Sequence, residues 1–284
     1  MPEKILPEKI DAHHHLWRYT PSEYGWIDDR MRTLRRDFLP ADLEKEAQAA
    51  GIAGTVSVQA RQTLEETDWL LSLAAGSPLL RGVVGWAPIT SERFPAELER
   101  LRAHKKLKGL RHVIQDEPDV NFINGPDFHR GISALQGSGL VYDILIFEKH
   151  LSAAVAFVDR HPNQIFILDH MAKPRIREGA IEPWRNQIVE LAHRDNVYCK
   201  LSGLVTEAAW ETWSEDSLRV YVEIAVAAFS PRRMMVGSDW PVCLLATTYG
   251  KWFATVDRLV ATLSSAEKDR ILGGTAVEVY RLHD

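Results

Sequence analysis

Eight short apolar runs rich in β-branched residues, separated by stretches with helical periodicity, constrain the fold of this chain more than any other feature. The runs are apolar on both faces, which is typical of parallel strands covered by helices. Eight such alternations within 284 residues predict a single (β/α)8 TIM-type barrel, one domain over residues 1–284, rather than a doubly wound open sheet. We expect the strands at 10–13, 54–59, 82–86, 109–113, 141–146, 165–170, 197–201 and 234–238. We expect the helices at 40–50, 67–75, 96–104, 126–137, 151–161, 182–193, 218–229 and 252–263, with a final helix that begins at a Ser264 to Glu267 capping box.

Two of the expected connections are longer than a barrel needs. The first, residues 16–39, carries Trp17, Tyr19, Tyr24 and Trp26. Loops of this length are usually functional or disordered, and the aromatic content argues against disorder. We therefore expect an aromatic lid over the carboxyl ends of the strands. The second long connection is residues 202–216.

The charge and cysteine content narrow the kind of partner that this chain has. A net charge of -5 gives no electrostatic reason to expect DNA, RNA or an anionic membrane, so we expect a small-molecule ligand. The two cysteines form no C-x-x-C motif, which indicates neither a disulfide framework nor a zinc knuckle. With no secretion signal and no apolar run of membrane-spanning length, we expect a cytoplasmic protein, as a monomer or a homodimer.

The first expected strand ends in three consecutive histidines. Side chains alternate along a strand, so His13 and His15 should share one face while His14 points the other way. Two imidazoles so placed can ligate a single cation. A carboxylate, Asp239, follows the last expected strand. If these two strand ends adjoin, the sheet must close into a barrel.

Polar residues also end the other expected strands. Active sites of such barrels lie at the carboxyl ends of the strands. Burying so many ionisable groups costs free energy unless they pair, ligate a metal or contact a substrate. These residues are Gln59, Trp86, Arg111, His112, Asp143, Asp169, His170, Lys200, Ser202, Asp239 and Trp240.

Two of these positions also allow an ordinary structural role. Asp239 could cap the helix that follows Trp240 and Pro241. Arg111 and His112 could instead form a buried ion pair with Asp143 or Asp116.

Several stretches of the chain resemble the amidohydrolase superfamily, in the amidohydrolase-related branch that includes sugar lactonases. The resemblance extends over nearly the whole chain and rests chiefly on Asp11-Ala12-His13-His14-His15-Leu16-Trp17, Leu168-Asp169-His170-Met171-Ala172-Lys173-Pro174, Cys199-Lys200-Leu201-Ser202-Gly203-Leu204 and Gly237-Ser238-Asp239-Trp240-Pro241-Val242-Cys243.

This resemblance implies roles for individual residues. His13, His15 and His170 match the metal-facing histidines, and Asp239 matches the carboxylate that takes a proton from the attacking water. Two-metal members carry a carboxylated lysine where this chain has Arg111 and His112, so a two-metal centre is not expected. The resemblance allows one divalent metal such as Zn²⁺, held by His13, His15, His170 and Asp239, or a site that works without one; no organic cofactor is expected.

The expected activity is hydrolysis of a lactone to its acid by water, with an aldonolactone such as L-fuconolactone as the substrate that the resemblance favours. Asp239 would be the general base, while His170 and Arg111, or a metal, would stabilise the oxyanion. The expected substrate contacts are Arg111, Trp26, Tyr24, Gln59, His112, Asp143 and Trp240. A single strand-end arginine favours a neutral polyol lactone, because a dicarboxylate substrate would call for several.

Four other functions stay open at this point. A 2-pyrone-4,6-dicarboxylate-type lactonase would share the chemistry but bind an anionic substrate. A metal-dependent decarboxylase of an unsaturated or aromatic acid, or an amide hydrolase, could use the same barrel. A sugar-acid binding protein without catalysis would need no ordered base.

Overall fold

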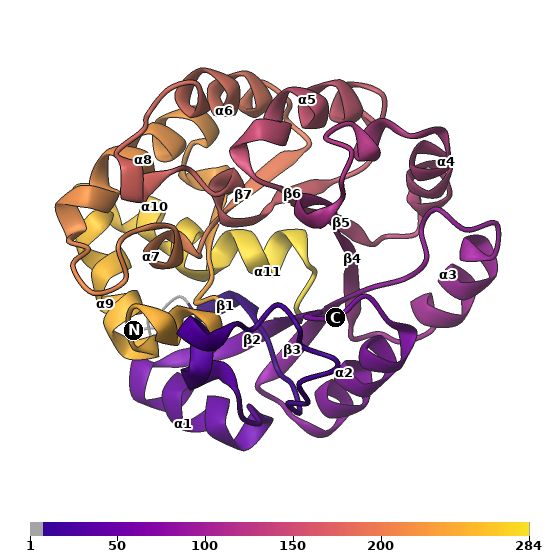
Figure 1. Ribbon diagram of the computed structural model, residues 1–284, viewed down its shortest axis with the longest axis horizontal. Coiled ribbons are helices and arrows are strands. Elements are labelled where there is room, and N and C mark those ends of the chain that lie inside the picture. The colour runs from indigo at the N-terminus through magenta and orange to yellow at the C-terminus, as the bar shows by residue number, and fades with distance from the viewer. Residues whose placement is uncertain (1–7, 284) are drawn as a thin grey trace, which may run out of the picture.

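The strands of this chain form one closed ring. The computed structural model describes residues 8–283 and contains an eight-stranded sheet in which each strand pairs in parallel with the next, in the order β1 to β8 (Figure 1). This arrangement confirms the predicted (β/α)8 barrel. The strands are β1 (Lys9–His14), β2 (Ile52–Val58), β3 (Leu80–Gly85), β4 (Leu107–Val113), β5 (Val141–Leu145), β6 (Phe166–Leu168), β7 (Val197–Leu201) and β8 (Met234–Val236).

Most of the helices surround the strands on the outside of the ring (Figure 1). Residues that favour helix starts stand where the sequence predicts them: Pro40 begins α1, and Ser264 and Glu267 form the capping box of α10. The helices are α1 (Pro40–Ala50), α2 (Leu64–Gly76), α3 (Phe94–Arg102), α4 (Pro126–Leu135), α5 (Leu151–Asp159), α6 (Trp184–Ala192), α7 (Leu204–Glu207), α8 (Glu215–Phe229), α9 (Tyr249–Leu259), α10 (Ser265–Asp269) and α11 (Thr275–Val279). The predicted helices therefore all form, with ends that shift by a few residues.

The ring closes between β1 and the segment that follows β8. The backbone N–H of Asp239 donates to the carbonyl of His13 at 2.8 Å, and that of His15 donates to the carbonyl of Trp240 at 2.6 Å. The two strand ends that carry the histidines and the carboxylate are thus neighbours, as the closure argument requires.

A β-bulge in β1 decides which way its histidines point. Asp11 pairs with Thr55 and His14 pairs with Ser57, so β1 contains one residue more than β2 between these two pairs. Bulges of this kind redirect side chains next to functional sites. His14 faces away from the barrel interior, where its Nε2 lies 3.0 Å from the Thr55 hydroxyl, and His13 and His15 face inward. The shared face of His13 and His15 is confirmed.

The end of the chain fills the amino-terminal end of the barrel. Ala276, Tyr280 and Leu282 pack with Ile10 and the other apolar residues inside the strands. Lys108 on β4 donates from Nζ to the carbonyl of Arg281 at 2.8 Å. In Figure 1 α11, coloured yellow, accordingly crosses the middle of the ring. These residues therefore close the amino-terminal end of the barrel.

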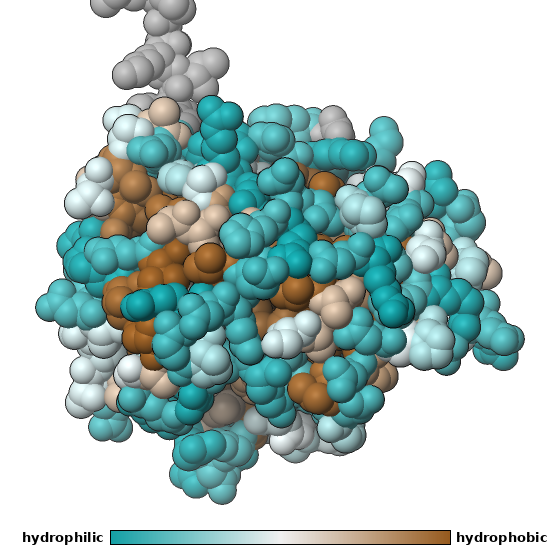
Figure 2. Space-filling view, turned by 90° about the horizontal axis from the view of Figure 1, so that it is seen from above, coloured by the Kyte–Doolittle hydropathy of each residue, from teal (hydrophilic) through white to brown (hydrophobic). Residues whose placement is uncertain are grey.

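The outer surface is mostly polar. Figure 2 shows hydrophilic side chains over most of one face, with hydrophobic ones gathered in its recesses. Trp26, in the loop after β1, is the most exposed large hydrophobic residue among those described, at 42%. No helix within residues 8–283 combines the length and the apolarity needed to cross a membrane.

Candidate active site

A cavity of about 740 Å³ opens at the carboxyl ends of the strands. This volume is typical of small-molecule sites. The strand ends supply His15, Arg111, His170 and Asp239 to its wall. The connecting loops supply most of the rest, chiefly Glu23, Trp26, Met31, Arg61, Gln115, Asp116, Lys173, Thr206, Glu207 and Trp210.

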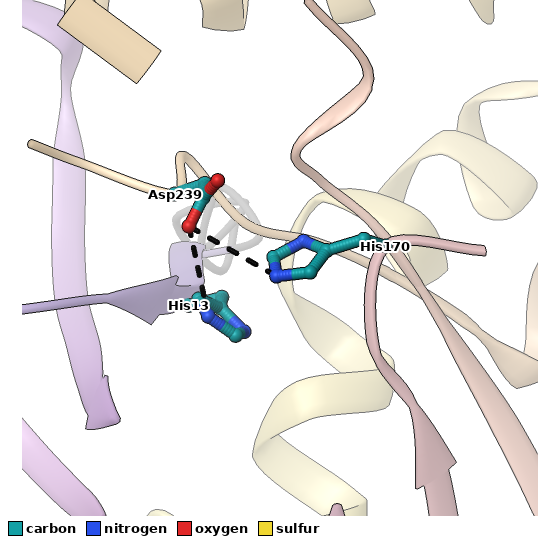
Figure 3. Close-up of side chains that lie close together, drawn as sticks. All are labelled: His13, His170 and Asp239. Carbon is teal, nitrogen blue, oxygen red and sulfur yellow. Dashed lines mark ion pairs between the residues drawn. The ribbon is translucent and has the colours of Figure 1, made fainter. Parts of the chain in front are cut away.

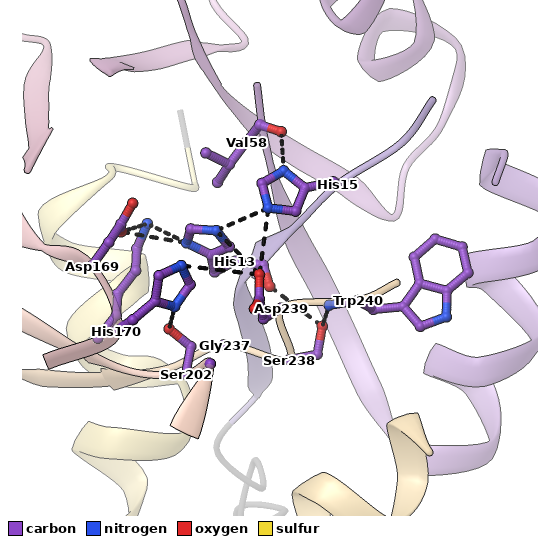
Figure 4. A network of polar contacts seen from close by, with 12 residues as sticks. His13, His15, Val58, Asp169, His170, Ser202, Gly237, Ser238, Asp239 and Trp240 are labelled. Carbon is purple, nitrogen blue, oxygen red and sulfur yellow. Dashed lines mark hydrogen bonds and ion pairs between the residues drawn. The ribbon is translucent and has the colours of Figure 1, made fainter. Parts of the chain in front are cut away.

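Asp239 is the carboxylate on which the histidines converge. Its Oδ1 lies 3.4 Å from His15 Nε2, 3.8 Å from His13 Nε2 and 4.0 Å from His170 Nε2 (Figure 4). Asp239 is only 5% exposed, yet it lines the cavity. The barrel thus presents one buried carboxylate, surrounded by imidazoles, to whatever enters.

The backbone at Asp239 is held in an unusual conformation. Asp239 has a φ of 57°, in the left-handed region that residues other than glycine rarely adopt. Behind it, the Ser238 hydroxyl donates to the Asp11 carboxylate at 2.6 Å and accepts a hydrogen bond from the N–H of Trp240 at 3.0 Å. Strain that the surrounding structure maintains in this way is common at functional sites.

His170 is placed by a longer left-handed segment directly after β6. His170, Met171, Ala172 and Lys173 all have φ values between 51° and 59°. Each such residue costs roughly 1–2 kcal/mol relative to the right-handed conformation. The segment is secured by the Trp184 indole N–H, which donates to the Met171 carbonyl at 2.8 Å. This turn brings both His170 and Lys173 to the cavity wall.

Gly203 leaves the room that His170 needs. A Cβ atom on Gly203 would lie 2.6 Å from His170 Nδ1, and the φ of this residue is +68°. Beside it, the Ser202 hydroxyl lies 2.9 Å from the same Nδ1. The glycine and the serine together fix the His170 ring, with its Nε2 directed to Asp239.

A network of buried charges lies beneath the cavity. Lys200 Nζ contacts Asp143 Oδ2 at 2.5 Å, Asp169 Oδ1 at 2.9 Å and His13 Nδ1 at 3.2 Å, and Arg111 Nη1 donates to Asp169 Oδ2 at 2.9 Å. Lys200 and both carboxylates are fully buried. Such charges are tolerated only when they are paired. The network anchors His13 from below.

Burial keeps His13 and His170 neutral. It lowers the pKa of His13 well below its usual value, and it lowers the pKa of His170 to about 4 although Asp239 and Asp169 act in the opposite direction. Burial would raise the pKa of the Asp239 carboxyl, but His170 and His15 outweigh it, and the pKa is below its usual value. Near neutral pH the site therefore holds an ionised Asp239 carboxylate beside the neutral imidazoles of His13 and His170.

Three residues of the site fit a metal ion. His13, His170 and Asp239 each offer one ligand atom, and these atoms lie within 4.8 Å of one another (Figure 3). Two neutral imidazoles and one carboxylate are a donor set that zinc accepts, and three protein ligands leave a coordination position open, as in catalytic zinc sites. His15, the fourth expected ligand, lies outside this group, although its Nε2 is 3.3 Å from that of His13.

Only some of the residues expected to contact the substrate line the cavity. Arg111 and Trp26 line the cavity as expected, and Tyr24 is buried behind its wall. Four expected substrate contacts lie elsewhere among protein groups. Each of the four is engaged with another protein group instead of the cavity. Gln59 contacts Arg111, and His112 lies 2.6 Å from Glu117. Asp143 contacts Lys200 and Tyr280, and Trp240 packs on Phe38.

Both ordinary structural roles considered for these positions are wrong. The short helix that follows Trp240 begins after Pro241, while the Asp239 side chain faces the histidines. Arg111 does form a buried ion pair, but its partner is Asp169 rather than Asp143 or Asp116.

The cavity wall also contains four residues for which the sequence predicts no contact with a substrate: Lys173, Glu207, Glu23 and Asp116. Glu23 comes from the loop after β1, whose length did predict a role near the site. Glu207 comes from the second long connection, so loop length was the available signal there too. Lys173 carried no such signal.

One loop of the cavity wall depends on a buried carboxyl group. Glu66 Oε2 accepts hydrogen bonds from the backbone N–H groups of Ala60 at 3.0 Å and Arg61 at 2.7 Å. Glu66 is 1% exposed, and burial raises its pKa from 4.5 to about 7, against the effect of these hydrogen bonds. Glu66 thus holds the start of the 60–63 loop, which lines the cavity.

We expect Glu66 to make the stability of the protein depend on pH. As the pH rises from 4.5 towards 7, the unfolded carboxyl ionises while the folded one stays protonated, so the free energy of unfolding falls. The loss should approach about 3 kcal/mol, since each pKa unit corresponds to about 1.4 kcal/mol. Urea unfolding of the wild type and Glu66→Gln across this range measures it, because the variant lacks the titration. Exposed Glu65→Gln is the control, and an equal pH dependence in Glu66→Gln would contradict the assignment.

Comparison with known proteins agrees with this geometry. The sequence profile of the amidohydrolase family matches residues 10–282. An L-fucono-1,5-lactonase from Burkholderia multivorans is 41% identical over 285 residues, covering 96% of each chain, and one from Burkholderia ambifaria is 37% identical with the same coverage. A crystal structure of an amidohydrolase from Burkholderia multivorans with bound zinc superposes with a TM-score of 0.94 at 40% identity, covering 96% of this chain and 99% of that one.

Proposed function

This chain belongs to the amidohydrolase family, and from that membership we propose that it hydrolyses a sugar lactone, an aldonolactone such as L-fucono-1,5-lactone, to the sugar acid. The observation that carries the proposal is the Asp239 carboxylate, buried among three imidazoles and open to the cavity. Its lowered pKa keeps it ionised and able to accept a proton from water at neutral pH.

The charges of the cavity favour an uncharged substrate. Each cation of the wall already faces a carboxylate: Arg61 contacts Glu23, Arg111 contacts Asp169, and Lys173 lies 3.9 Å from Glu207. A dicarboxylate substrate would have to compete with these partners, whereas a neutral lactone with several hydroxyl groups would not. This balance supports the sugar lactone over the 2-pyrone-4,6-dicarboxylate alternative.

In the proposed reaction, water attacks the lactone carbonyl and Asp239 takes its proton. Arg111 Nη1 lies 3.4 Å from His13 Nε2 on the same side of the site, so its positive charge can stabilise the oxyanion that forms. The oxyanion then re-forms the carbonyl and the ring C–O bond breaks. The ring oxygen takes the proton that Asp239 holds and becomes a hydroxyl group of the open sugar acid, which returns Asp239 to its ionised form. The protein thereby supplies the base, the oxyanion charge and a site whose barrel floor is closed to solvent.

The residues that would hold a metal are His13, His170 and Asp239, with His15 beside them. Zinc in that position supplies a Lewis acid and lowers the pKa of a water molecule.

Proton release, followed with a pH indicator, tests the proposed function. The purified protein is given aldonolactones, with L-fucono-1,5-lactone first, and 2-pyrone-4,6-dicarboxylate beside them. We expect acid to form from the sugar lactone and not from the dicarboxylate. Turnover of the dicarboxylate alone would overturn the proposal in favour of that lactonase. Carbon dioxide release from an aromatic acid, with no lactone turned over, would indicate the decarboxylase.

We also expect the wild-type protein to retain zinc, close to one ion per chain, after dialysis against metal-free buffer. His170→Asn should bring the zinc content to background, because it removes one of three ligands. Atomic absorption measures the content directly, without reference to activity. The matched control is His193→Asn, since that histidine is exposed, at 68% of its side chain. Equal zinc in His170→Asn and the wild type would contradict the ligand assignment.

A further inference from the structure

We propose that Lys173 and Glu207 form the subsite that binds the ring hydroxyl groups of the lactone, and that they give the enzyme its preference for hydroxylated over plain lactones. The inference rests on the proposed function, since it concerns the substrate of the same cavity. Both residues line that cavity, from the connections after β6 and β7.

The separation of the two charged groups leaves their hydrogen-bonding capacity free. Lys173 Nζ and Glu207 Oε1 are 3.9 Å apart, which is too far for a direct hydrogen bond. Within residues 8–283 neither charged group makes a hydrogen bond to another side chain or to the backbone. A hydroxyl group placed between them could accept from the ammonium and donate to the carboxylate. Hydrogen bonds to charged groups are the stronger ones that a neutral polyol can make.

The other cavity cations are already engaged. Arg111 Nη1 donates to Asp169 at 2.9 Å, and Arg61 makes a direct ion pair with Glu23. Lys173 differs from these two arginines, because the one carboxylate within ion-pair distance of it in residues 8–283, that of Glu207, lies beyond hydrogen-bond distance. Neither Lys173 nor Glu207 belongs to the His13, His170 and Asp239 cluster, so the pair can bind hydroxyl groups while that cluster acts on the carbonyl.

The backbone that carries Lys173 is costly to form. Lys173 ends the left-handed segment that begins at His170, with a φ of 51°. Strained conformations of non-glycine residues persist at ligand clamps, where the surrounding structure maintains them. The Lys173 ammonium also lies 5.3 Å from the centre of the Phe147 ring, a distance at which the ring attracts a cation. Lys173 is therefore held over the cavity by two independent features of the fold.

Glu207 has surroundings suited to a sugar. It ends α7, and Trp210 stands one turn further along, with its indole N–H donating to the Thr206 carbonyl at 2.9 Å. Thr206 and Trp210 line the cavity beside it. Burial raises the pKa of the Glu207 carboxyl and the Asp239 charge adds to this, against the effect of Lys173. The cavity wall here thus includes both an acidic group and an indole, and a sugar ring likewise has polar and apolar surfaces.

The test compares L-fucono-1,5-lactone with δ-valerolactone, a six-membered lactone that has no ring hydroxyl groups. We expect Glu207→Gln and Lys173→Met each to raise KM for the sugar lactone about 10- to 100-fold, since each removes a hydrogen bond to a charged group. Their kcat should change less than KM. δ-Valerolactone is measured as a substrate or as a competitive inhibitor, and its KM or Ki should stay within about twofold, because its binding uses neither group.

Glu23→Gln is the matched control, because Glu23 is the other wall carboxylate that faces a cation. It should affect the two lactones alike. Circular dichroism of each variant establishes that it is folded. Equal losses on both lactones in folded Glu207→Gln and Lys173→Met, or no loss on the sugar lactone, would overturn the inference alone. A wild-type enzyme that turns over no sugar lactone would overturn the proposed function, and this inference with it.

Discussion

Asp239→Asn should lower kcat on the lactone by about 10²- to 10⁴-fold, the usual contribution of a general base. Asparagine has nearly the shape of aspartate but does not accept the proton of the attacking water. The backbone hydrogen bond from Asp239 to His13, which closes the barrel, does not involve the side chain and should persist. Initial rates at saturating lactone measure the change, and thermal unfolding establishes that the variant is folded.

The matched control for this prediction is Asp116→Asn. Asp116 also lines the cavity, but no histidine of the described part of the chain lies within ion-pair distance of it. Its replacement should leave kcat within about threefold of the wild type, as expected for a group outside the chemistry. A rate for Asp239→Asn within tenfold of the wild type would exclude Asp239 as the base.

Lys200→Met should lower the free energy of unfolding by about 3–5 kcal/mol, the usual cost of removing one partner from a buried ion pair. The variant would leave Asp143 and Asp169, both fully buried, without the ammonium that now lies 2.5 and 2.9 Å from them. Burial already raises the pKa of Asp143 to about 6 with Lys200 present. Urea unfolding at neutral pH measures the loss.

Two further variants make this prediction specific. Lys200→Met combined with Asp143→Asn should be more stable than Lys200→Met alone, because Asp169 keeps its ion pair with Arg111 and the second change removes the carboxylate that loses its cation. Lys105→Met, at an exposed position, should change the free energy of unfolding by less than about 0.5 kcal/mol. If Lys200→Met lowered the free energy of unfolding by no more than Lys105→Met does, the network would not stabilise the fold.

The fold could be predicted from the sequence because parallel strands covered on both faces leave continuous apolar runs. All eight runs became strands, and the closure between β1 and the β8 end follows from the residues that the two strand ends carry. The bulge in β1 could not be predicted, since no glycine or proline marks it.

The sequence did not predict how deep each side chain lies within the barrel. Asp143 and Leu145 point the same way along β5, but Leu145 reaches the cavity while Asp143 lies one layer deeper, against Lys200. Alternation along a strand fixes the face of a residue and says nothing about its height, which depends on the stagger between strands. The position of Lys173 could not be predicted for a different reason: its left-handed turn contains no glycine that would indicate such a conformation.

The seal at the amino-terminal end of the barrel has a consequence for how this chain is made on the ribosome. Tyr280 donates from its hydroxyl to Asp143 at 2.9 Å, and Leu282 packs in the same interior cluster as Ile10. Synthesis runs from the amino terminus, so the first strands emerge long before the residues that fill the space between them. The barrel interior can be completed only when the last segment has left the exit tunnel. Until then the apolar interior of the strands lacks the Tyr280 and Leu282 side chains that cover it.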